Sequence, residues 1–222
     1  MKLISSVVIT VFILVQISYA IIYNVTTNSE LIKALNSVNP GDTISLADGY
    51  YVGKFQSLRS GTKEQPITLT GSKLAILTSK NQTDQGNAFY LNSTSYWILN
   101  GFSVYNSAKG ILIDSSNNIL INDVYVHQIG QEGVHFRSNS CDNTLQNSTI
   151  AYTGRTDPGY GEAVYIGSAV ENWINEIADL SHRNRVINNK FGPYIGAEAI
   201  DIKVYTRLII ININNFLYIK LN

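Results

Sequence analysis

The chain has 222 residues with 16 basic and 16 acidic side chains, so its formal net charge at pH 7 is zero. This balance gives no basic surface for a nucleic acid, and we expect no nucleic-acid partner. A single cysteine, Cys141, excludes an internal disulfide, and we expect its side chain to be buried. Few residues are charged, whereas tyrosine and glycine are abundant, which is typical of a β-rich protein.

Residues 1–20 have the features of a secretory signal peptide. Lys2 precedes a largely apolar stretch from Val7 to Val15, and Ser18-Tyr19-Ala20 supplies small residues where a signal peptidase cuts. A membrane anchor is the alternative, but the stretch is shorter than the ~20 apolar residues that span a bilayer. We therefore expect a secreted, extracellular monomer with no membrane anchor after cleavage. Its glycosylation sequences are at Asn24, Asn81, Asn92 and Asn147.

Four segments repeat one pattern, in which a small residue is followed by apolar residues two positions apart. Side chains two apart on a strand point to the same side, so each segment predicts a short strand with one buried face. The repeat length of ~20–25 residues is typical of one solenoid coil. The segments are 110–114, 133–137, 163–167 and 199–203, and their buried faces are Ile111 and Ile113, Val134 and Phe136, Val164 and Ile166, and Ile200 and Ile202.

A second strand follows in most coils, marked by an apolar residue two positions before an asparagine. Asparagines stacked at one corner of a solenoid can hydrogen-bond to each other and to the turn backbone. Isolated asparagines in ordinary turns are the alternative. The predicted ladder consists of Asn100, Asn122, Asn147 and Asn188.

The segment that begins at residue 28 predicts a short amphipathic helix over the N-terminal end of the solenoid. Asn28 or Ser29 would cap this helix, and Pro40-Gly41 would end it. Residues 43–46 alternate in polarity and predict the first strand. A helix at this end would cover strand edges that could otherwise pair with other chains. Its core-facing residues would be Leu31, Ile32 and Leu35.

Several blocks in the first half of the chain are distinctive: Pro40-Gly41-Asp42-Thr43-Ile44, Ala47-Asp48-Gly49-Tyr50, Gln65-Pro66-Ile67-Thr68-Leu69 with Gly71-Ser72, and Tyr96-Trp97-Ile98-Leu99-Asn100-Gly101-Phe102. The chain resembles, over about residues 28–203, the β-helix polysaccharide lyases of the pectate lyase, chondroitinase and alginate lyase type. The resemblance implies an all-β, right-handed, single-stranded parallel β-helix for residues 21–203. Because such relatives continue for further coils, we expect this domain to be incomplete at its C-terminal end.

Residues 204–222 differ in composition from the repeats. They are rich in isoleucine and asparagine, whose codons are A/T-rich, as a translated intron or a lost reading frame would give. We therefore expect this tail not to belong to the native fold. A genuine last strand is the alternative, because Ile209, Ile211 and Ile213 alternate.

Alignment of the repeats places three glutamates, Glu132, Glu162 and Glu198, in one column with Lys109 one coil below. Neighbouring strands lie ~4.8 Å apart. Carboxylates at that spacing repel each other, and would share a proton or attract a cation. A solvated turn, where screening weakens the repulsion, is the alternative. The next columns outward are His135, Tyr165 and Asp201, and then Arg137 and Lys203.

A lyase that acts on a uronic acid polymer removes the proton α to a carboxylate, once a cation or an arginine has neutralised that carboxylate. The resemblance implies that Ca²⁺ is held by outward acidic residues and that a lysine or arginine is the base. An ion pair with Glu198 or Asp201 is the alternative for Lys203, and a surface position is the alternative for His135. Mapped onto this chain, the Ca²⁺ ligands are Glu132, Glu162, Glu198 and Asp201, the base is Lys203, the carboxylate clamp is Arg137, and a further catalytic candidate is His135.

Two inserted loops, residues 155–160 and 171–182, are expected to line the binding face. We expect substrate contacts by Arg155 and Tyr160 of the first loop and by Tyr165 of the outward column. The sequence thus predicts a secreted lyase for an acidic polysaccharide such as pectate, with Ca²⁺ as cofactor. The alternatives are a non-catalytic carbohydrate-binding solenoid, or a glycoside hydrolase that uses a carboxylate pair such as Glu162 and Asp201.

Overall fold

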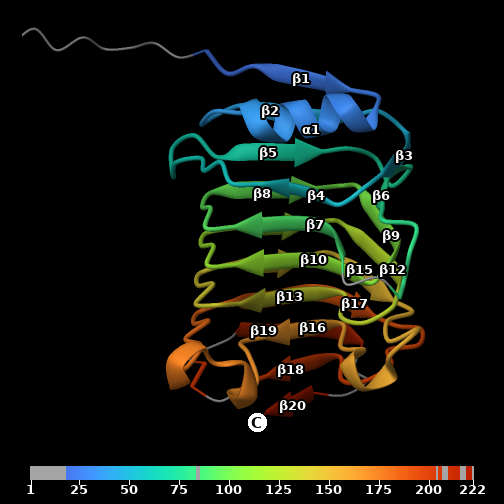
Figure 1. Cartoon of the computed structure of the whole chain (residues 1–222), viewed down its shortest axis with the longest axis vertical. Coiled ribbons are helices and arrows are strands. Elements are labelled where there is room, and N and C mark those ends of the chain that lie inside the picture. The colour runs from blue at the N-terminus through green and yellow to red at the C-terminus, as the bar shows by residue number, and fades with distance from the viewer. Residues whose placement is uncertain (1–18, 84–85, 204, 207–209, 216–218, 222) are drawn as a thin grey trace, which may run out of the picture.

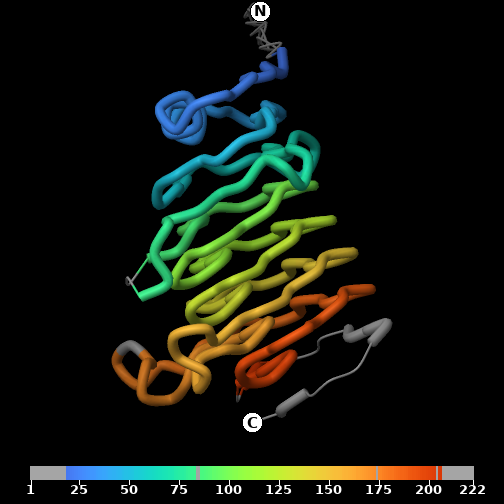
Figure 2. The backbone as a smooth tube through the Cα atoms, turned by 90° about the vertical axis from the view of Figure 1, so that its right-hand side faces the viewer, coloured from blue at the N-terminus to red at the C-terminus, as the bar shows by residue number. Residues whose placement is uncertain are grey.

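A computed structural model describes residues 19–83, 86–203, 205–206, 210–215 and 219–221. The predicted signal peptide therefore lies almost entirely outside the described residues. The chain winds into coils that stack along one axis, with the N-terminal strands at one end and the C-terminal strands at the other (Figures 1 and 2). Strands of successive coils pair in parallel, which confirms the predicted solenoid.

The strands form a 13-stranded sheet and a seven-stranded sheet. The larger sheet contains two rows, joined because β17 (Arg185–Phe191) pairs with a strand of each row. The first row is β1 (Ile22–Val25), β2 (Thr43–Leu46), β5 (Ile67–Thr70), β8 (Trp97–Asn100), β11 (Leu120–Asn122), β14 (Thr144–Gln146) and β17. The second row is β3 (Gly49–Val52), β6 (Ala75–Thr78), β9 (Ser103–Ser107), β12 (Tyr125–Ile129) and β15 (Thr149–Ala151). Its last strand, β15, pairs with the C-terminal end of β17.

The seven-stranded sheet carries the four predicted repeats. Their apolar residues two positions apart are buried, and they pack with residues of the other rows into one core. The strands are β4 (Phe55–Ser57), β7 (Asn87–Asn92), β10 (Lys109–Asp114), β13 (Val134–Arg137), β16 (Val164–Ile166), β18 (Ile200–Ile202) and β20 (Ile219–Leu221). The other side chains of β10, β13, β16 and β18 are aligned in register on the outer face of the sheet.

Helix α1 (Asn28–Ser37) covers the N-terminal coils, as predicted (Figure 1). Its N-cap is Thr27 and not Asn28 or Ser29, because Thr27 and Glu30 form a reciprocal capping box. Ile32 was expected in the core but is exposed, since it points away from the coils. Leu31 and Leu35 are buried, as predicted.

The first strand is also earlier than predicted. β1 precedes the helix and pairs in parallel with β2, so the predicted strand over residues 43–46 is the second strand of its row.

The outer asparagine ladder is only partly correct. Asn122 Nδ2 donates to Asn100 Oδ1 at 2.7 Å, so these two residues stack as predicted. The next residue in register is Gln146, and not Asn147. Asn147 and Asn188 instead have positive φ angles at bends of the chain. The prediction was wrong there because β14 starts at Thr144, one residue earlier than the predicted alignment, and a shift of one residue reverses the side of every side chain.

A second ladder, which the sequence analysis did not identify, runs through the interior. Asn143 and Asn184 are both fully buried. Asn143 Oδ1 accepts the N–H of Ile119 at 2.9 Å, and Asn184 Oδ1 accepts the N–H of Asn143 at 3.0 Å. Asn143 Nδ2 donates to the carbonyl of Ser116 at 3.0 Å. The ladder thus satisfies turn backbone that is buried away from water.

Cys141 lies at one of the turns and is half-buried, whereas the sequence analysis expected burial. Its thiol donates to the carbonyl of Leu180 at 3.1 Å, and Sγ accepts the N–H of His182 at 3.3 Å. The thiol therefore takes part in the contacts between coils, and this polar role explains its partial exposure.

Two strands lie in the tail of residues 204–222. β19 (Ile210–Asn215) pairs in parallel with β17, with two shifts of register, and β20 pairs in parallel with β18. That the tail is foreign to the native fold stays a prediction. No helix in the described parts of the chain is long and apolar enough to cross a membrane.

We expect Asn143→Ala to lower the free energy of unfolding by about 1–3 kcal/mol, because it leaves buried groups of Ile119 and Ser116 without partners. Urea denaturation followed by circular dichroism measures this change. Asn36→Ala on the exposed side of α1 is the control and should change stability by less than about 0.5 kcal/mol. Equal stability of the two variants would contradict the role of the inner ladder.

Candidate active site

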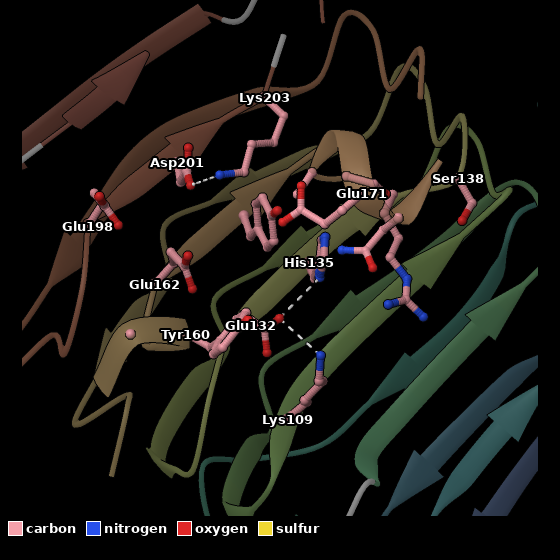
Figure 3. Close-up of a pocket in the computed structure, with 16 residues that line it drawn as sticks. Lys109, Glu132, His135, Ser138, Tyr160, Glu162, Glu171, Glu198, Asp201 and Lys203 are labelled. Atoms are coloured by element: carbon pink, nitrogen blue, oxygen red, sulfur yellow. Dashed lines mark hydrogen bonds and ion pairs between the residues drawn. The ribbon is translucent and has the colours of Figure 1, made fainter. Parts of the chain in front are cut away.

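A cavity of about 660 Å³ lies on the outer face of the seven-stranded sheet, over β13, β16 and β18 (Figure 3). The two inserted loops adjoin it from opposite ends of β16. The first loop contains the short helix η1 (Pro158–Tyr160) and precedes β16, whereas the second contains η2 (Val170–Asn172) and follows β16. Tyr160 and Glu171 from these loops line the cavity, as expected, but the exposed Arg155 does not.

The predicted columns are present. The N–H of Gly133 donates to the carbonyl of Glu162, and the N–H of Ala163 donates to the carbonyl of Glu198, so the coils stack in the expected register. His135, Tyr165 and Asp201 are aligned across β13, β16 and β18. All three glutamates of the first column line the cavity.

Glu132 forms ion pairs and lies outside the carboxylate cluster described below. Its Oε1 lies 3.0 Å from Lys109 Nζ and 3.5 Å from His135 Nδ1 (Figure 3). Burial acts to raise the pKa of Glu132, but the interactions with His135 and Lys109 outweigh it and lower the pKa to about 2. Glu132 is therefore a charged carboxylate that holds Lys109 and His135 in place.

The other three predicted metal ligands form a compact cluster. Carboxylate oxygens of Glu162, Glu198 and Asp201 lie within 4.8 Å of one another. Burial, together with the charges of Glu132, Asp201 and Glu198, raises the pKa of Glu162 to about 7. Glu162 Oε2 is buried and has no hydrogen-bond partner among the described residues. Oxygen-only donors are the set that Ca²⁺ prefers, so these three residues fit a calcium ion.

Lys203 forms the ion pair that the sequence analysis gave as an alternative to the role of base. Its Nζ lies 2.6 Å from Asp201 Oδ2 and 5.0 Å from the centre of the Tyr165 ring. Burial, and then the charges of Asp201 and Glu162, raise the pKa of Tyr165, so its phenol is neutral at neutral pH. Asp201 therefore fixes the lysine above a protonated tyrosine.

His135 is buried, so the predicted alternative of a surface position is wrong. Its ring stacks on Tyr165 with centroids 4.1 Å apart and an interplanar angle of 20°. Its Nε2 lies 2.9 Å from the carbonyl oxygen of Gly167. The alignment of the outward column predicted that His135 and Tyr165 are neighbours. His135 thus lies between Tyr165, on which its ring stacks, and Glu132.

Arg137 lines the cavity but already holds a carboxylate of the protein. Its Nε and Nη2 donate to the two oxygens of Asp114 at 2.7 and 3.0 Å, a bidentate pair. Asp114 also accepts the hydroxyl of Tyr90 at 2.9 Å. This pair was not predicted, although Asp114 and Arg137 are partners in the register of neighbouring strands, which is a signal that the sequence repeats contain. The predicted role of Arg137 as a carboxylate clamp stays a prediction.

Asp179 is a buried residue that the sequence analysis also missed. It accepts the N–H groups of Ser138 and Asn139 at 2.7 and 2.8 Å, and the hydroxyl of Ser168 at 2.6 Å. Burial acts to raise the pKa of Asp179, but these hydrogen bonds outweigh it and keep the pKa low. Asp179 thus ties the second inserted loop to the end of β13.

Comparisons with known proteins identify the family and the fold of the chain. The family model described as Pel9A-like, right-handed β-helix region matches residues 23–164. An alginate lyase from Paenibacillus sp. str. FPU-7 is 34% identical, with 85% of this chain covering 64% of that chain at a TM-score of 0.80. The chain thus spans less than two thirds of the length of that alginate lyase. A comparison with curated protein sequences finds no significant match.

Two further solved structures share the fold at lower identity. A polysaccharide lyase of family PL6 from Pseudopedobacter saltans is 20% identical, with 81% of this chain covering 41% of that chain at a TM-score of 0.59. The pectate lyase Pel9A is 17% identical, with 84% of this chain covering 53% of that chain at a TM-score of 0.60. The predicted right-handed parallel β-helix is confirmed, and the chain belongs to the family of Pel9A-like right-handed β-helix proteins.

Proposed function

We propose that the protein is a polysaccharide lyase that cleaves a uronic acid polymer by β-elimination. The observation that carries this proposal is the lysine held beside three clustered carboxylates on the floor of the cavity. The identity of 34% to an alginate lyase supports a uronate polymer as the substrate. Alginate is therefore the first substrate to test, and pectate is the second. Export and a monomeric state, expected from the sequence, are part of the same proposal.

The charge of the cavity supports a requirement for a cation. Its described lining contains more acidic than basic side chains, so an acidic polymer would be repelled unless positive charge were added. We propose Glu162, Glu198 and Asp201 as ligands of Ca²⁺, which would neutralise the substrate carboxylate and so acidify the α proton. The lining contains the acidic residues Glu132, Glu162, Glu171, Glu198 and Asp201, and the basic residues Lys109, Arg137 and Lys203.

In the proposed β-elimination, Lys203 removes one proton from the substrate and Tyr165 supplies another to the leaving group. Lys203 first gives up the proton with which it pairs to Asp201, a loss that a cation bound to Asp201 would favour. As the free amine it takes the α proton, the carbon–carbon double bond forms, and the glycosidic carbon–oxygen bond breaks. The leaving oxygen takes a proton from the neutral phenol of Tyr165, which lies beneath the lysine. His135 holds the Tyr165 ring from the other side, and Arg137 at the cavity edge orients a substrate carboxylate.

An activity screen distinguishes this proposal from its alternatives. Alginate, pectate and dermatan are each incubated with the protein, with Ca²⁺ or with excess chelator. A lyase forms an unsaturated product that absorbs in the ultraviolet, a hydrolase forms reducing ends only, and a binding protein forms neither. Ultraviolet absorbance that requires Ca²⁺ is the expected result, and full activity in excess chelator would exclude the cation.

Lys203→Arg should abolish turnover and leave the fold intact. Arginine keeps the charge that pairs with the buried Asp201, but it holds its proton far more firmly than lysine, and its longer, planar head would not place a free nitrogen where the lysine amine lies. Lys203→Ala is less informative, because it would leave Asp201 buried without this counter-charge. We expect a fall in the rate of about 10²-fold or more with an unchanged melting temperature. Lys33→Arg on α1 is the matched control, and a Lys203→Arg variant as fast as the wild type would exclude Lys203 as the base.

The raised pKa of Glu162 predicts a pH-dependent stability. Its pKa is about 7 when folded and 4.5 ordinarily, so the folded state binds the extra proton in this window. The contribution of Glu162 to stability is therefore fully present below about pH 4.5 and is lost as the pH rises through about 7, by at most about 3 kcal/mol. Glu162→Gln should remove this loss, and Ca²⁺ should restore stability to the wild type at pH 8 but less so to the variant. Chemical denaturation at pH 5 and pH 8 measures both effects, and parallel profiles of the two proteins would contradict them.

A further inference from the structure

A second hollow of about 230 Å³ adjoins the cavity where the strands of the seven-stranded sheet end. It shares the lining residues Ser138, Ser168 and Asn172 with the cavity, so the two spaces are direct neighbours. The cavity extends along β13 from Glu132, before the strand, to Ser138, after it (Figure 3). A polymer that lies in the cavity along this direction would therefore enter the hollow next.

The outer wall of the hollow is apolar. Trp173 and Ile177 come from the second inserted loop, around the short helix η3 (Ile174–Glu176), and Ile177 is 67% exposed. Trp173 Nε1 donates to the carbonyl of Ser168 at 3.1 Å, and the indole meets Tyr205 edge to face with centroids 5.7 Å apart. The hydrogen bond to Ser168 orients the ring before any ligand binds, and it does so without the tail in which Tyr205 lies. A fixed aromatic face next to polar groups suits the apolar face and the hydroxyl groups of a sugar ring.

The hollow differs from the cavity in charge. Among its described lining residues there is no lysine, arginine or histidine, and the charged one is Asp179. This carboxylate accepts hydrogen bonds from the backbone and from serine hydroxyls, and is committed to holding the loop. A sugar carboxylate in the hollow would meet a negative charge and no positive one, whereas a sugar without a charge would meet no such penalty.

We propose that this hollow is a subsite that binds an uncharged unit of the polymer, either a neutral sugar or a uronate with an esterified carboxyl group. The unit would stack on Trp173, next to the charged unit held in the cavity. This inference rests on the proposed function for the identity of the polymer. The protein should then favour chains in which charged and uncharged units alternate or are mixed over fully charged chains.

Tryptophan fluorescence tests this subsite without turnover. The chain has two tryptophans, and because Trp97 is fully buried, a change of emission on binding reports on Trp173. The inactive Lys203→Arg variant is titrated with oligouronates from alginate and from pectate, as free acids and as partial methyl esters of equal length. We expect the esters to change the emission and to bind about three- to tenfold more tightly than the free acids. Trp173→Phe should remove the signal, while calorimetry still detects binding.

Two substitutions test the wall itself. Trp173→Ala should remove the preference for the ester, and Ile177→Ser, which leaves the indole in place, should reduce it. Tyr50→Ala replaces an exposed tyrosine of β3 and is the matched control, with an unchanged Kd. Equal Kd values for ester and free acid, unaffected by Trp173→Ala, would overturn the subsite even if the lyase is active. A preference that depends on Trp173 in a protein that forms no unsaturated product would support the subsite and refute the proposed function.

Discussion

Parallel pairing of the coils in register is the interaction on which the rest of this structure depends. It places the same position of successive coils about one strand spacing apart, ~4.8 Å, whatever side chain stands there. Apolar side chains at such positions bury one another and build the core. Buried asparagines such as Asn143 and Asn184 supply turn backbone with partners. Carboxylates at the same spacing repel each other, so one geometry produces both the stable interior and the charged cavity.

The negative charges of the clustered carboxylates in the cavity are compensated in different ways. Glu132 is held by Lys109 and His135, and Asp201 is held by Lys203. Glu162, between these two, has a pKa raised to about 7 by burial and by the neighbouring charges. A proton or a metal ion can relieve the same repulsion, so the affinity for a cation should increase with pH in the range where Glu162 loses its proton. The column of like charges is thus the physical origin of the proposed dependence on Ca²⁺.

The sequence predicted the features that follow from period and register, and missed those that do not. The outward columns that bring Glu162, Tyr165 and Asp201 together were predictable, because side chains alternate along a strand and coils stack in register. The outer asparagine ladder was predicted only in part, since β14 starts one residue earlier than the predicted alignment and Gln146 takes the place expected for Asn147. Asp179 and Trp173 lie in an insertion without a repeat, so no periodicity indicates what they contact.

The direction of the cavity bears on how a solenoid can distinguish sugar units. Along the solenoid axis, a polymer would meet similar side chains at each coil, because register repeats each column. Along the strands, it meets different columns in turn: the glutamates, then Tyr165 and its neighbours, then Arg137 and Lys203. The hollow beside Trp173, whose described lining has no basic residue, comes last. The two inserted loops at opposite ends of β16 favour this second direction. Recognition of a mixed polymer therefore requires a path across the columns, in which each sugar unit meets a different chemical environment.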